Sequence, residues 1–139
     1  MRGIETAHAP VPAGHYAQGV VHGGVVYVAG QLPLNPITSK PLDSSQLDDP
    51  SREALADAQT ERTLRNVEAV LVAAGTDLSH VLSATLYVTG RDLWAPVNEA
   101  FARVMGAHKP ARAIVPVPEL KPGCLVEIQV TAAVPGEHP

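Results

Sequence analysis

Two charged residues in the last third of the chain have side chains that could do chemistry together. Arg112 lies in the apolar run 110–115, and Glu127 lies in the apolar run 125–130. A guanidinium binds a carboxylate through two parallel N–H···O hydrogen bonds, and a glutamate held nearby can transfer protons. If the two runs are strands that converge, Arg112 and Glu127 form a site for a small carboxylic acid with a reactive group beside its carboxylate.

Each of these two residues also has a plainer interpretation. Arg112 fits a surface arginine on an edge strand, and Glu127 fits a solvated glutamate that shares a polar strand face with Gln129 and Thr131. Two observations favour the site. The segment Lys109-Pro110-Ala111 is a rigid entry that fixes where the strand of Arg112 begins. Charges are scarce around Glu127, and an unpaired glutamate that protein covers would be costly.

Three other polar residues carry a weaker signal. Tyr16 precedes the first apolar run, whereas Asn66 and Asn98 lie in two helical segments. A tyrosine at such a place usually packs on the core with its hydroxyl in water, and helix amides usually face solvent. Local sequence alone therefore assigns none of the three to a site.

The sequence lacks the usual motifs for metals, nucleotides and serine nucleophiles. Its six histidines form no helical i, i+4 pair with an acid between them, and Cys124 has no second cysteine. We therefore expect neither a zinc site nor an internal disulfide. Dinucleotide, phosphate-loop and serine-elbow motifs are also missing, which argues against hydride transfer, phosphoryl transfer and acyl-serine chemistry.

Composition predicts one domain with a covered surface. The chain has 139 residues, of which 45% are hydrophobic and only 17% charged, against about 25% charged in ordinary globular domains. A homo-oligomer is the simplest explanation. The net charge of −4 and the lack of a basic cluster argue against a nucleic-acid partner. Residues 1–12 have no apolar core, so we do not expect them to be a signal peptide. No run reaches the roughly 18 apolar residues of a membrane helix. The single cysteine fits a protein of the reducing cytoplasm.

The pattern of apolar residues predicts strands joined by turns and two long irregular segments. Residues 1–13 form a surface arm, and residues 35–50, with three prolines, form a long loop of the kind that is often functional or mobile. His22-Gly23-Gly24 supplies the positive φ of a tight hairpin. The expected strands are 17–21, 25–29, 32–34, 81–88, 113–117 and 125–134.

Two helices are expected between these strands. Apolar residues at helical spacing predict a helix over about 51–74, with Asp49 as its N-cap and Pro50 at its first position. A second helix starts from Asp92 as its cap and ends at Gly106. The element order predicts an α+β fold in which both helices pack on one face of a single mixed sheet. The other face would then be covered by sister subunits.

Taken together, seven short motifs resemble the reactive intermediate deaminase family, also called the RidA/YjgF or L-PSP family. The resemblance runs from about Gly14 to Ala133, nearly the whole chain. The motifs that carry it are Gly14-His15-Tyr16-Ala17-Gln18, Val28-Ala29-Gly30-Gln31, Gln59-Thr60 with Asn66-Val67 and Ala73-Ala74-Gly75, Val97-Asn98, Pro110-Ala111-Arg112, Leu120-Lys121-Pro122-Gly123 and Val126-Glu127-Ile128.

The resemblance implies an architecture and a reaction. Residues 1–139 would form one domain of chorismate-mutase-like α+β fold, assembled as a homotrimer around a central β-barrel with sites between subunits. Relatives that keep the arginine hydrolyse reactive 2-imino and enamine acids, such as 2-aminoacrylate and 2-iminobutanoate, to 2-keto acids and ammonia. Neither a metal nor an organic cofactor is required, and the partners are the substrate and the sister subunits, with no nucleic acid and no membrane.

The same resemblance implies roles for individual residues. Arg112 would hold the substrate carboxylate. Glu127 would activate the attacking water or pass a proton to the leaving nitrogen. Fixing water beside an imine carbon that is already electrophilic supplies most of what the reaction needs. The cleft would also be lined by the side chains of Tyr16 and Asn98 and by the backbones of Gly30 and Ile114.

Departures from the family pattern keep other functions open. His15, Ala17 and Ala29 replace the common Pro, Ser and Ser, Ile114 replaces a common cysteine, and the 35–50 loop is longer than usual. The loop favours, as one alternative, a pathway enzyme that acts on a larger imine. A second alternative is a non-catalytic trimer that binds a 2-keto acid and regulates a partner. RNA cleavage, an activity attributed to some relatives, is least compatible with the acidic balance.

Overall fold

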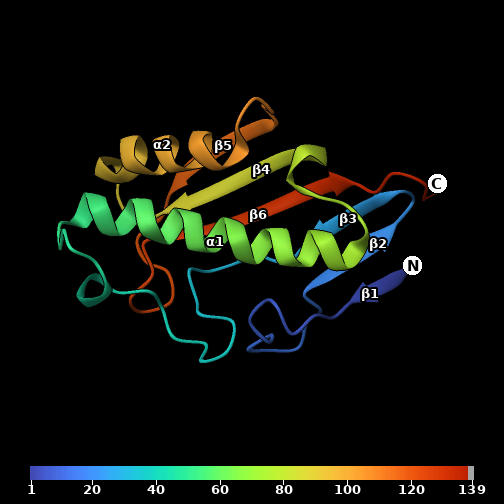
Figure 1. The fold of residues 1–139 in the computed structure, drawn as a ribbon, viewed down its shortest axis with the longest axis horizontal. Helices are drawn as coiled ribbons and strands as arrows, with labels where there is room; N and C mark the ends of the chain where they lie inside the picture. Colours follow the sequence, from blue (N-terminus) through green and yellow to red (C-terminus); the bar gives the residue numbers. More distant parts are fainter. Residues whose placement is uncertain (138–139) are drawn as a thin grey trace.

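One mixed sheet forms the centre of the structure, a computed structural model that describes residues 1–137. Within those residues six strands follow the order β1-β2-β3-β6-β4-β5, and only the β4–β5 pair is parallel. The strands are β1 (Arg2–Ile4), β2 (Gly19–His22), β3 (Val25–Val28), β4 (Val81–Val88), β5 (Ala111–Pro116) and β6 (Val126–Ala133). β5 therefore forms one edge of the sheet, and the N-terminal β1 forms the other (Figure 1).

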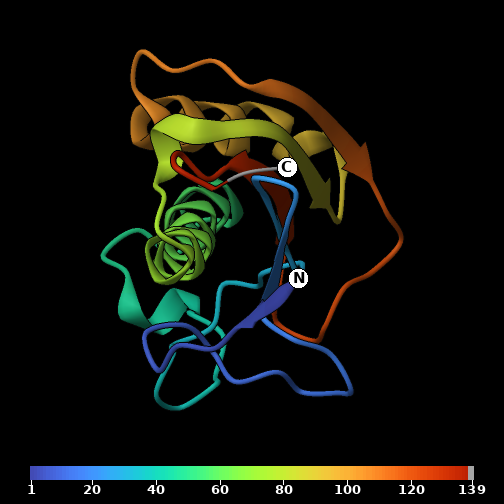
Figure 2. The same ribbon diagram turned by 90° about the vertical axis from the view of Figure 1, so that its right-hand side faces the viewer.

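Both long helices lie against the same face of this sheet. They are α1 (Arg52–Ala74) and α2 (Trp94–Met105), and in Figure 2 α1 is seen end-on beside the curved sheet. The chain also makes short 3-10 turns, η1 (Ser44–Gln46), η2 (Leu78–His80) and η3 (Arg91–Leu93). The expected α+β architecture, with a single mixed sheet and helices on one face, is confirmed.

The helix starts differ from the sequence prediction. Ser51, not Asp49, is the N-cap of α1, and its hydroxyl accepts a hydrogen bond from the backbone N–H of Ala54. Asp92 does not cap α2, because the turn η3 leads directly into the helix and the Asp92 carboxylate binds Arg52 at 2.9 Å instead. At the other end of α1, Gly75 adopts the left-handed conformation (φ 91°) that terminates the helix.

The strands β2 to β6 lie within two residues of their predicted bounds, and the prediction fails only at Arg2–Ile4 and at 32–34. The hairpin between β2 and β3 turns at Gly23 and Gly24, which both have positive φ. Arg2–Ile4, expected to belong to a surface arm, instead pairs with β2 as an edge strand. The short strand expected at 32–34 is wrong. The chain there makes only isolated bridges, from Gln31 to Ile128 and from Leu34 to Pro41.

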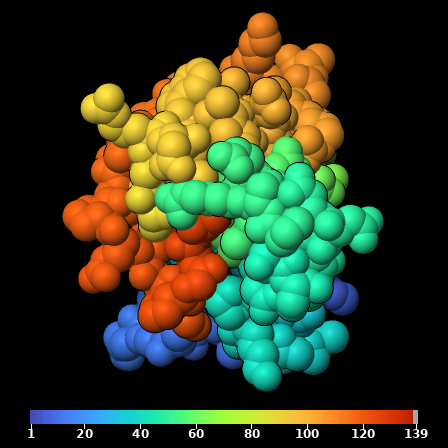
Figure 3. Space-filling model, turned by 90° about the vertical axis from the view of Figure 1, so that its left-hand side faces the viewer, coloured from blue at the N-terminus to red at the C-terminus, as the bar shows by residue number. Residues whose placement is uncertain are grey.

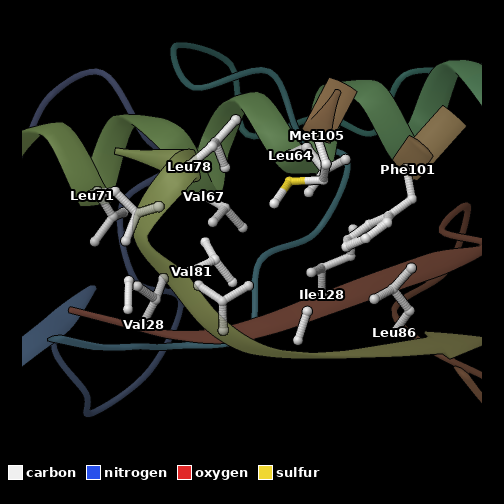
Figure 4. Close-up of a cluster of buried hydrophobic side chains, with 14 of the residues drawn as sticks. Val28, Leu64, Val67, Leu71, Leu78, Val81, Leu86, Phe101, Met105 and Ile128 are labelled. Carbon is white, nitrogen blue, oxygen red and sulfur yellow. The ribbon is translucent and has the colours of Figure 1, made fainter. Parts of the chain in front are cut away.

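The hydrophobic core fills the space between the helices and the sheet. Figure 4 shows the buried side chains of both helices meeting those of the strands. On β6 every second residue faces this core, so that Val126, Ile128 and Val130 are buried while Glu127 and Gln129 point to the other face. The alternation predicted for this strand is therefore confirmed.

The long segment 35–50 is tied to α1 and to the turn before β6. The side-chain amide of Gln59, which is fully buried, donates to the carbonyls of Leu42 and Gly123 and accepts from the N–H of Leu125. Figure 3 shows the face of the molecule on which this loop, the start of α1 and the turn before β6 come together. Apart from the turn η1, the expected long loop is present.

Candidate functional site

Arg112 lies near the start of β5 and reaches toward α2. Its Nη1 donates a hydrogen bond to Asn98 Oδ1 at 2.8 Å, and its guanidinium carbon lies 5.2 Å from the centre of the Phe101 ring. A cation above an aromatic face is attracted by the ring quadrupole. The amide of Asn98 and the ring of Phe101 therefore fix where this guanidinium lies.

The guanidinium faces an open pocket of about 400 Å³. Within residues 1–137, Arg112 has no acidic partner, whereas Arg103 binds both Asp57 and Glu61. The pocket is lined on the helix side by apolar groups, among them Phe101 and Met105, and on the strand side by Pro110 and Arg112. The remaining N–H donors of Arg112 are thus available to an anion that enters this pocket.

Ile114 follows Arg112 by two residues on the same strand face. Its Cα is paired with that of Leu86 on β4, and its half-buried side chain packs against the core. The side chain that replaces the family's common cysteine is therefore part of the packing beneath Arg112.

Glu127 lies on β6, on the sheet face that the helices leave open. It is half-buried, and no hydrogen bond reaches its carboxylate from the described part of the chain. Burial raises the pKa of the Glu127 carboxyl above its ordinary value. A carboxyl with a raised pKa binds a proton more readily than an ordinary glutamate, which favours a role in proton transfer.

Gly30 lies directly against this carboxylate. A Cβ added to Gly30 would come within 2.2 Å of Glu127 Oε2, so a larger residue at position 30 would displace the Glu127 carboxylate. Gly30 follows β3 at the point where the chain turns to bridge Gln31 to Ile128 on β6. The glycine at position 30 therefore leaves the space that the Glu127 carboxylate occupies.

Tyr16 lies close to Gly30. The two residues share a small hollow of about 60 Å³, and the hydroxyl of Tyr16 accepts a hydrogen bond from the N–H of Ala13 at 3.2 Å. The Tyr16 side chain is exposed, which differs from the core-packed tyrosine that local sequence favoured. Tyr16, Gly30 and Glu127 thus form one group, and Arg112, Asn98 and Ile114 form another.

These two groups do not meet within one protomer. The strand β4 separates β5 from β6, and its residues Ala84 and Tyr87 pair with Arg112 and Glu127 respectively. Residues three apart on a strand point to opposite faces. Arg112 therefore lies on the helix face, beside buried Ala84, and Glu127 lies on the open face.

Sequence reasoning missed two residues that shape this part of the molecule. Phe101, three residues after Asn98 on α2, was not singled out in the sequence as a site residue, yet its ring lies under Arg112. The i, i+3 spacing from Asn98 was the available signal. Asn66 is not a surface amide. It is fully buried and donates to the carbonyls of Leu32 and Leu34.

Other features of the chain bear on what chemistry is available. In the described residues, no three His, Cys, Asp or Glu side chains come together in a way that would hold a metal ion. Cys124 is buried, and desolvation raises the pKa of its thiol to about 11. Over the same residues no helix is long and apolar enough to cross a membrane.

Comparison with known proteins identifies relatives over almost the full length. A family model described as Endoribonuclease L-PSP matches residues 6–134. A RutC family protein of Pyrococcus horikoshii is 35% identical over 129 residues, which cover 93% of this chain and 94% of that protein. TdcF of Escherichia coli, named as a candidate reactive intermediate deaminase, is 32% identical over 134 residues, which cover 93% of this chain and 94% of TdcF.

Solved structures agree with this relationship. The crystal structure of RidA from an Antarctic Psychrobacter species matches with a TM-score of 0.84 at 31% identity, covering 96% of this chain and 100% of that one. The structure of E. coli TdcF with bound serine matches with a TM-score of 0.82 at 30% identity, covering 96% and 98%. The chain belongs to the RidA/YjgF/L-PSP family, as its sequence motifs indicated.

Proposed function

We propose that this protein hydrolyses reactive 2-imino and enamine acids, of the 2-aminoacrylate and 2-iminobutanoate type, to 2-keto acids and ammonia. The observation that carries the proposal is the state of Arg112. Its guanidinium is held by Asn98 and Phe101, has no acidic partner in residues 1–137, and faces a pocket of about 400 Å³. An arginine fixed in this way is prepared for a substrate carboxylate.

The proposal requires a second protomer, because Glu127 points away from Arg112 in the same chain. The open sheet face, which carries Glu127, exposes Tyr27 and Val115 and has few charges. An apolar face of this kind is typical of a protein–protein interface. We assign it to the interior of a homotrimer, in which Glu127 of one protomer lies beside the Arg112 pocket of its neighbour.

The residues then divide the reaction between them. Arg112 holds the carboxylate and leaves C2 of the iminium exposed to water. Ionised Glu127 takes a proton from the attacking water as its oxygen bonds to C2, and the C=N bond becomes a single bond. Protonated Glu127 returns the proton to the amino group of this carbinolamine and is ionised again. The C–N bond then breaks and ammonia leaves, while Glu127 takes the hydroxyl proton so that the carbonyl of the 2-keto acid forms. Glu127 finally loses this proton to the released ammonia. Raised proton affinity at Glu127 suits both steps.

The structure of the relative TdcF holds serine, a small molecule with an amino group on the carbon beside its carboxylate. This supports a small 2-imino or 2-enamino acid as the class of substrate. The apolar lining beside Arg112, from Phe101 and Met105, leaves room for a side chain on the substrate. A larger imine is therefore the second candidate substrate. Within a protomer the long 35–50 loop does not shape the Arg112 pocket, because it lines a different pocket. The loop therefore gives no evidence for a larger substrate in one protomer.

A trapping assay tests the proposed activity. Threonine dehydratase releases the imine, semicarbazide traps it, and added protein is expected to suppress trapping. Arg112→Ala should lower kcat/KM by about a hundredfold or more, because it removes a bidentate charge-assisted contact. The matched control is Arg65→Ala, which removes an exposed arginine bound to Glu68 on α1. Full suppression by Arg112→Ala, or none by the wild type, would contradict the proposal. If the wild type instead binds 2-ketobutyrate in calorimetry without turning over imines, the non-catalytic regulator is favoured.

A further inference from the structure

A second pocket lies between the 35–50 loop and α1, on the other side of the molecule from the Arg112 pocket. Its volume is about 490 Å³, and it is lined by loop residues from Asn35 to Gln46 and by Arg62 of α1. In Figure 1 this loop lies on one side of α1, whereas α2 and β5 lie on the opposite side. No residue lines both this pocket and the pocket of Arg112.

Arg62 is held firmly in this pocket. Its Nη2 donates to Asn66 Oδ1 at 2.9 Å, and Asn66 is itself fixed by bonds to the carbonyls of Leu32 and Leu34, at 2.9 Å each. Asn66 is fully buried, so it cannot move without breaking these bonds. The guanidinium of Arg62 is therefore oriented before any ligand arrives.

The charge of Arg62 is left uncompensated. Its Nε is buried and has no hydrogen-bond partner, and no carboxylate within residues 1–137 forms an ion pair with it. Burial lowers the pKa of the Arg62 guanidinium, and the like charge of Arg65 lowers it further. The buried Nε cannot meet a ligand, but Nη1 of Arg62 also forms no hydrogen bond within residues 1–137 and is not buried. Nη1 is therefore the donor that an acceptor entering the pocket can reach.

The other charged groups of the pocket favour an anion. Lys40 brings a second positive charge and forms no ion pair in the described residues. Asp43 is the one acid in the lining, and its carboxylate is already occupied by the N–H and hydroxyl of Ser45, which lower its pKa. The lining thus has a net charge of +1 at neutral pH, from Lys40 and Arg62 against Asp43.

We propose that this pocket binds a small anion through the guanidinium of Arg62 and the ammonium of Lys40, with a carboxylate or a phosphate as the recognised group. An arginine fork accepts two oxygens of either group, and a lysine adds a point charge. The hydroxyls of Thr38 and Ser45 lie in the same lining and can complete the contacts. This site is independent of the proposed deaminase reaction.

Titrations in the Arg112→Ala background test the site without interference from the first pocket. Inorganic phosphate and acetate are each added to the folded protein at constant ionic strength, and binding is followed by amide NMR shifts of residues 35–46 and Arg62. Saturable binding of at least one anion is expected. Saturation by phosphate alone or by acetate alone identifies the recognised group and supports the site.

Matched variants decide whether the pocket is responsible. Arg62→Gln removes the charge of Arg62 but keeps an amide donor for Asn66. Lys40→Gln removes the positive charge that the loop contributes to the pocket. Each is expected to weaken binding about tenfold or more, as loss of one charge-assisted contact does. Arg65→Gln, one turn along α1 and already bound to Glu68, should bind as tightly as the parent. No saturable binding in the parent, or equal affinity in all three variants, would overturn the proposal.

Discussion

Arg112 is positioned by neutral neighbours rather than by an acid. The amide of Asn98 and the ring of Phe101 fix its guanidinium without neutralising it. The carboxylate of Glu127 lies against the backbone of Gly30, which donates no hydrogen bond to it in the described residues. The Arg112 guanidinium can therefore still bind an anion, and the Glu127 carboxylate can still accept a proton.

Gly30→Ala is expected to lower activity without lowering stability much. The new Cβ would lie 2.2 Å from Glu127 Oε2 and must push that carboxylate aside, which the flexible glutamate side chain allows. A catalytic group displaced by about 1 Å can lose roughly a hundredfold in rate. The trapping assay should show this loss, while thermal unfolding stays close to wild type. Gly3→Ala, with nothing within 4 Å of its added Cβ, is the control. Wild-type kcat/KM in Gly30→Ala would show that the Glu127 carboxylate does not need its present position.

The raised pKa of Glu127 predicts how the Glu127→Gln variant depends on pH. In the folded protein the buried carboxyl holds its proton more tightly than in the unfolded chain, so its ionisation destabilises the fold. This cost is absent well below the ordinary glutamate pKa, grows as the pH rises from that value to the raised folded pKa, and is complete above the folded pKa. Glu127→Gln should therefore be more stable than wild type at pH 7 and equal to it at pH 3.5 or so, well below the ordinary pKa. Chemical denaturation at both pH values measures the difference, and a variant less stable at pH 7 would contradict the assigned cause.

For the helices and strands, local sequence patterns predicted well those elements that interactions between nearby residues determine. The β-branched runs of β2, β3, β4 and β6 and the apolar row of α1 place these elements within a few residues of where they lie. Errors arose where distant residues decide. β1 forms because residues such as Arg2 pair with β2 residues such as Val21. Asp92 does not cap α2 because its carboxylate binds Arg52, forty positions earlier in the chain. The local sequence around Arg2 or Asp92 does not reveal either partner.

The buried amide of Gln59 is the main tie between elements, joining α1, the 35–50 loop and the turn before β6. Gln59→Leu would leave two carbonyls and one N–H without partners in a partly buried place. At about 1 kcal/mol or more for each unsatisfied group, the free energy of unfolding should fall by roughly 3 kcal/mol. Urea denaturation measures this loss, and Val72→Ala, an exposed position on the same helix, should change stability little. A loss below about 1 kcal/mol would show that Gln59 does not hold the loop.

For the whole molecule, the sequence predicted the residues of the site better than their relation in space. Arg112 and Glu127 were expected to face each other if their strands converged. The strand β4 lies between them, and alternation turns the two side chains to opposite faces. Neither the position of β4 in the sheet nor the packing of a second protomer can be predicted from local periodicity. The proposed site therefore depends on assembly.

Mixing two inactive variants tests this dependence most directly. Arg112→Ala and Glu127→Gln are each expected to be inactive. When they are denatured together in equal amounts and refolded, random assembly should give intact Arg112–Glu127 pairs at roughly one quarter of the head-to-tail interfaces of a cyclic oligomer. We expect recovery of about a quarter of wild-type activity in the trapping assay, and none when Arg112→Ala is mixed with the double variant. No recovery from correctly refolded mixed oligomers would contradict a site shared between protomers.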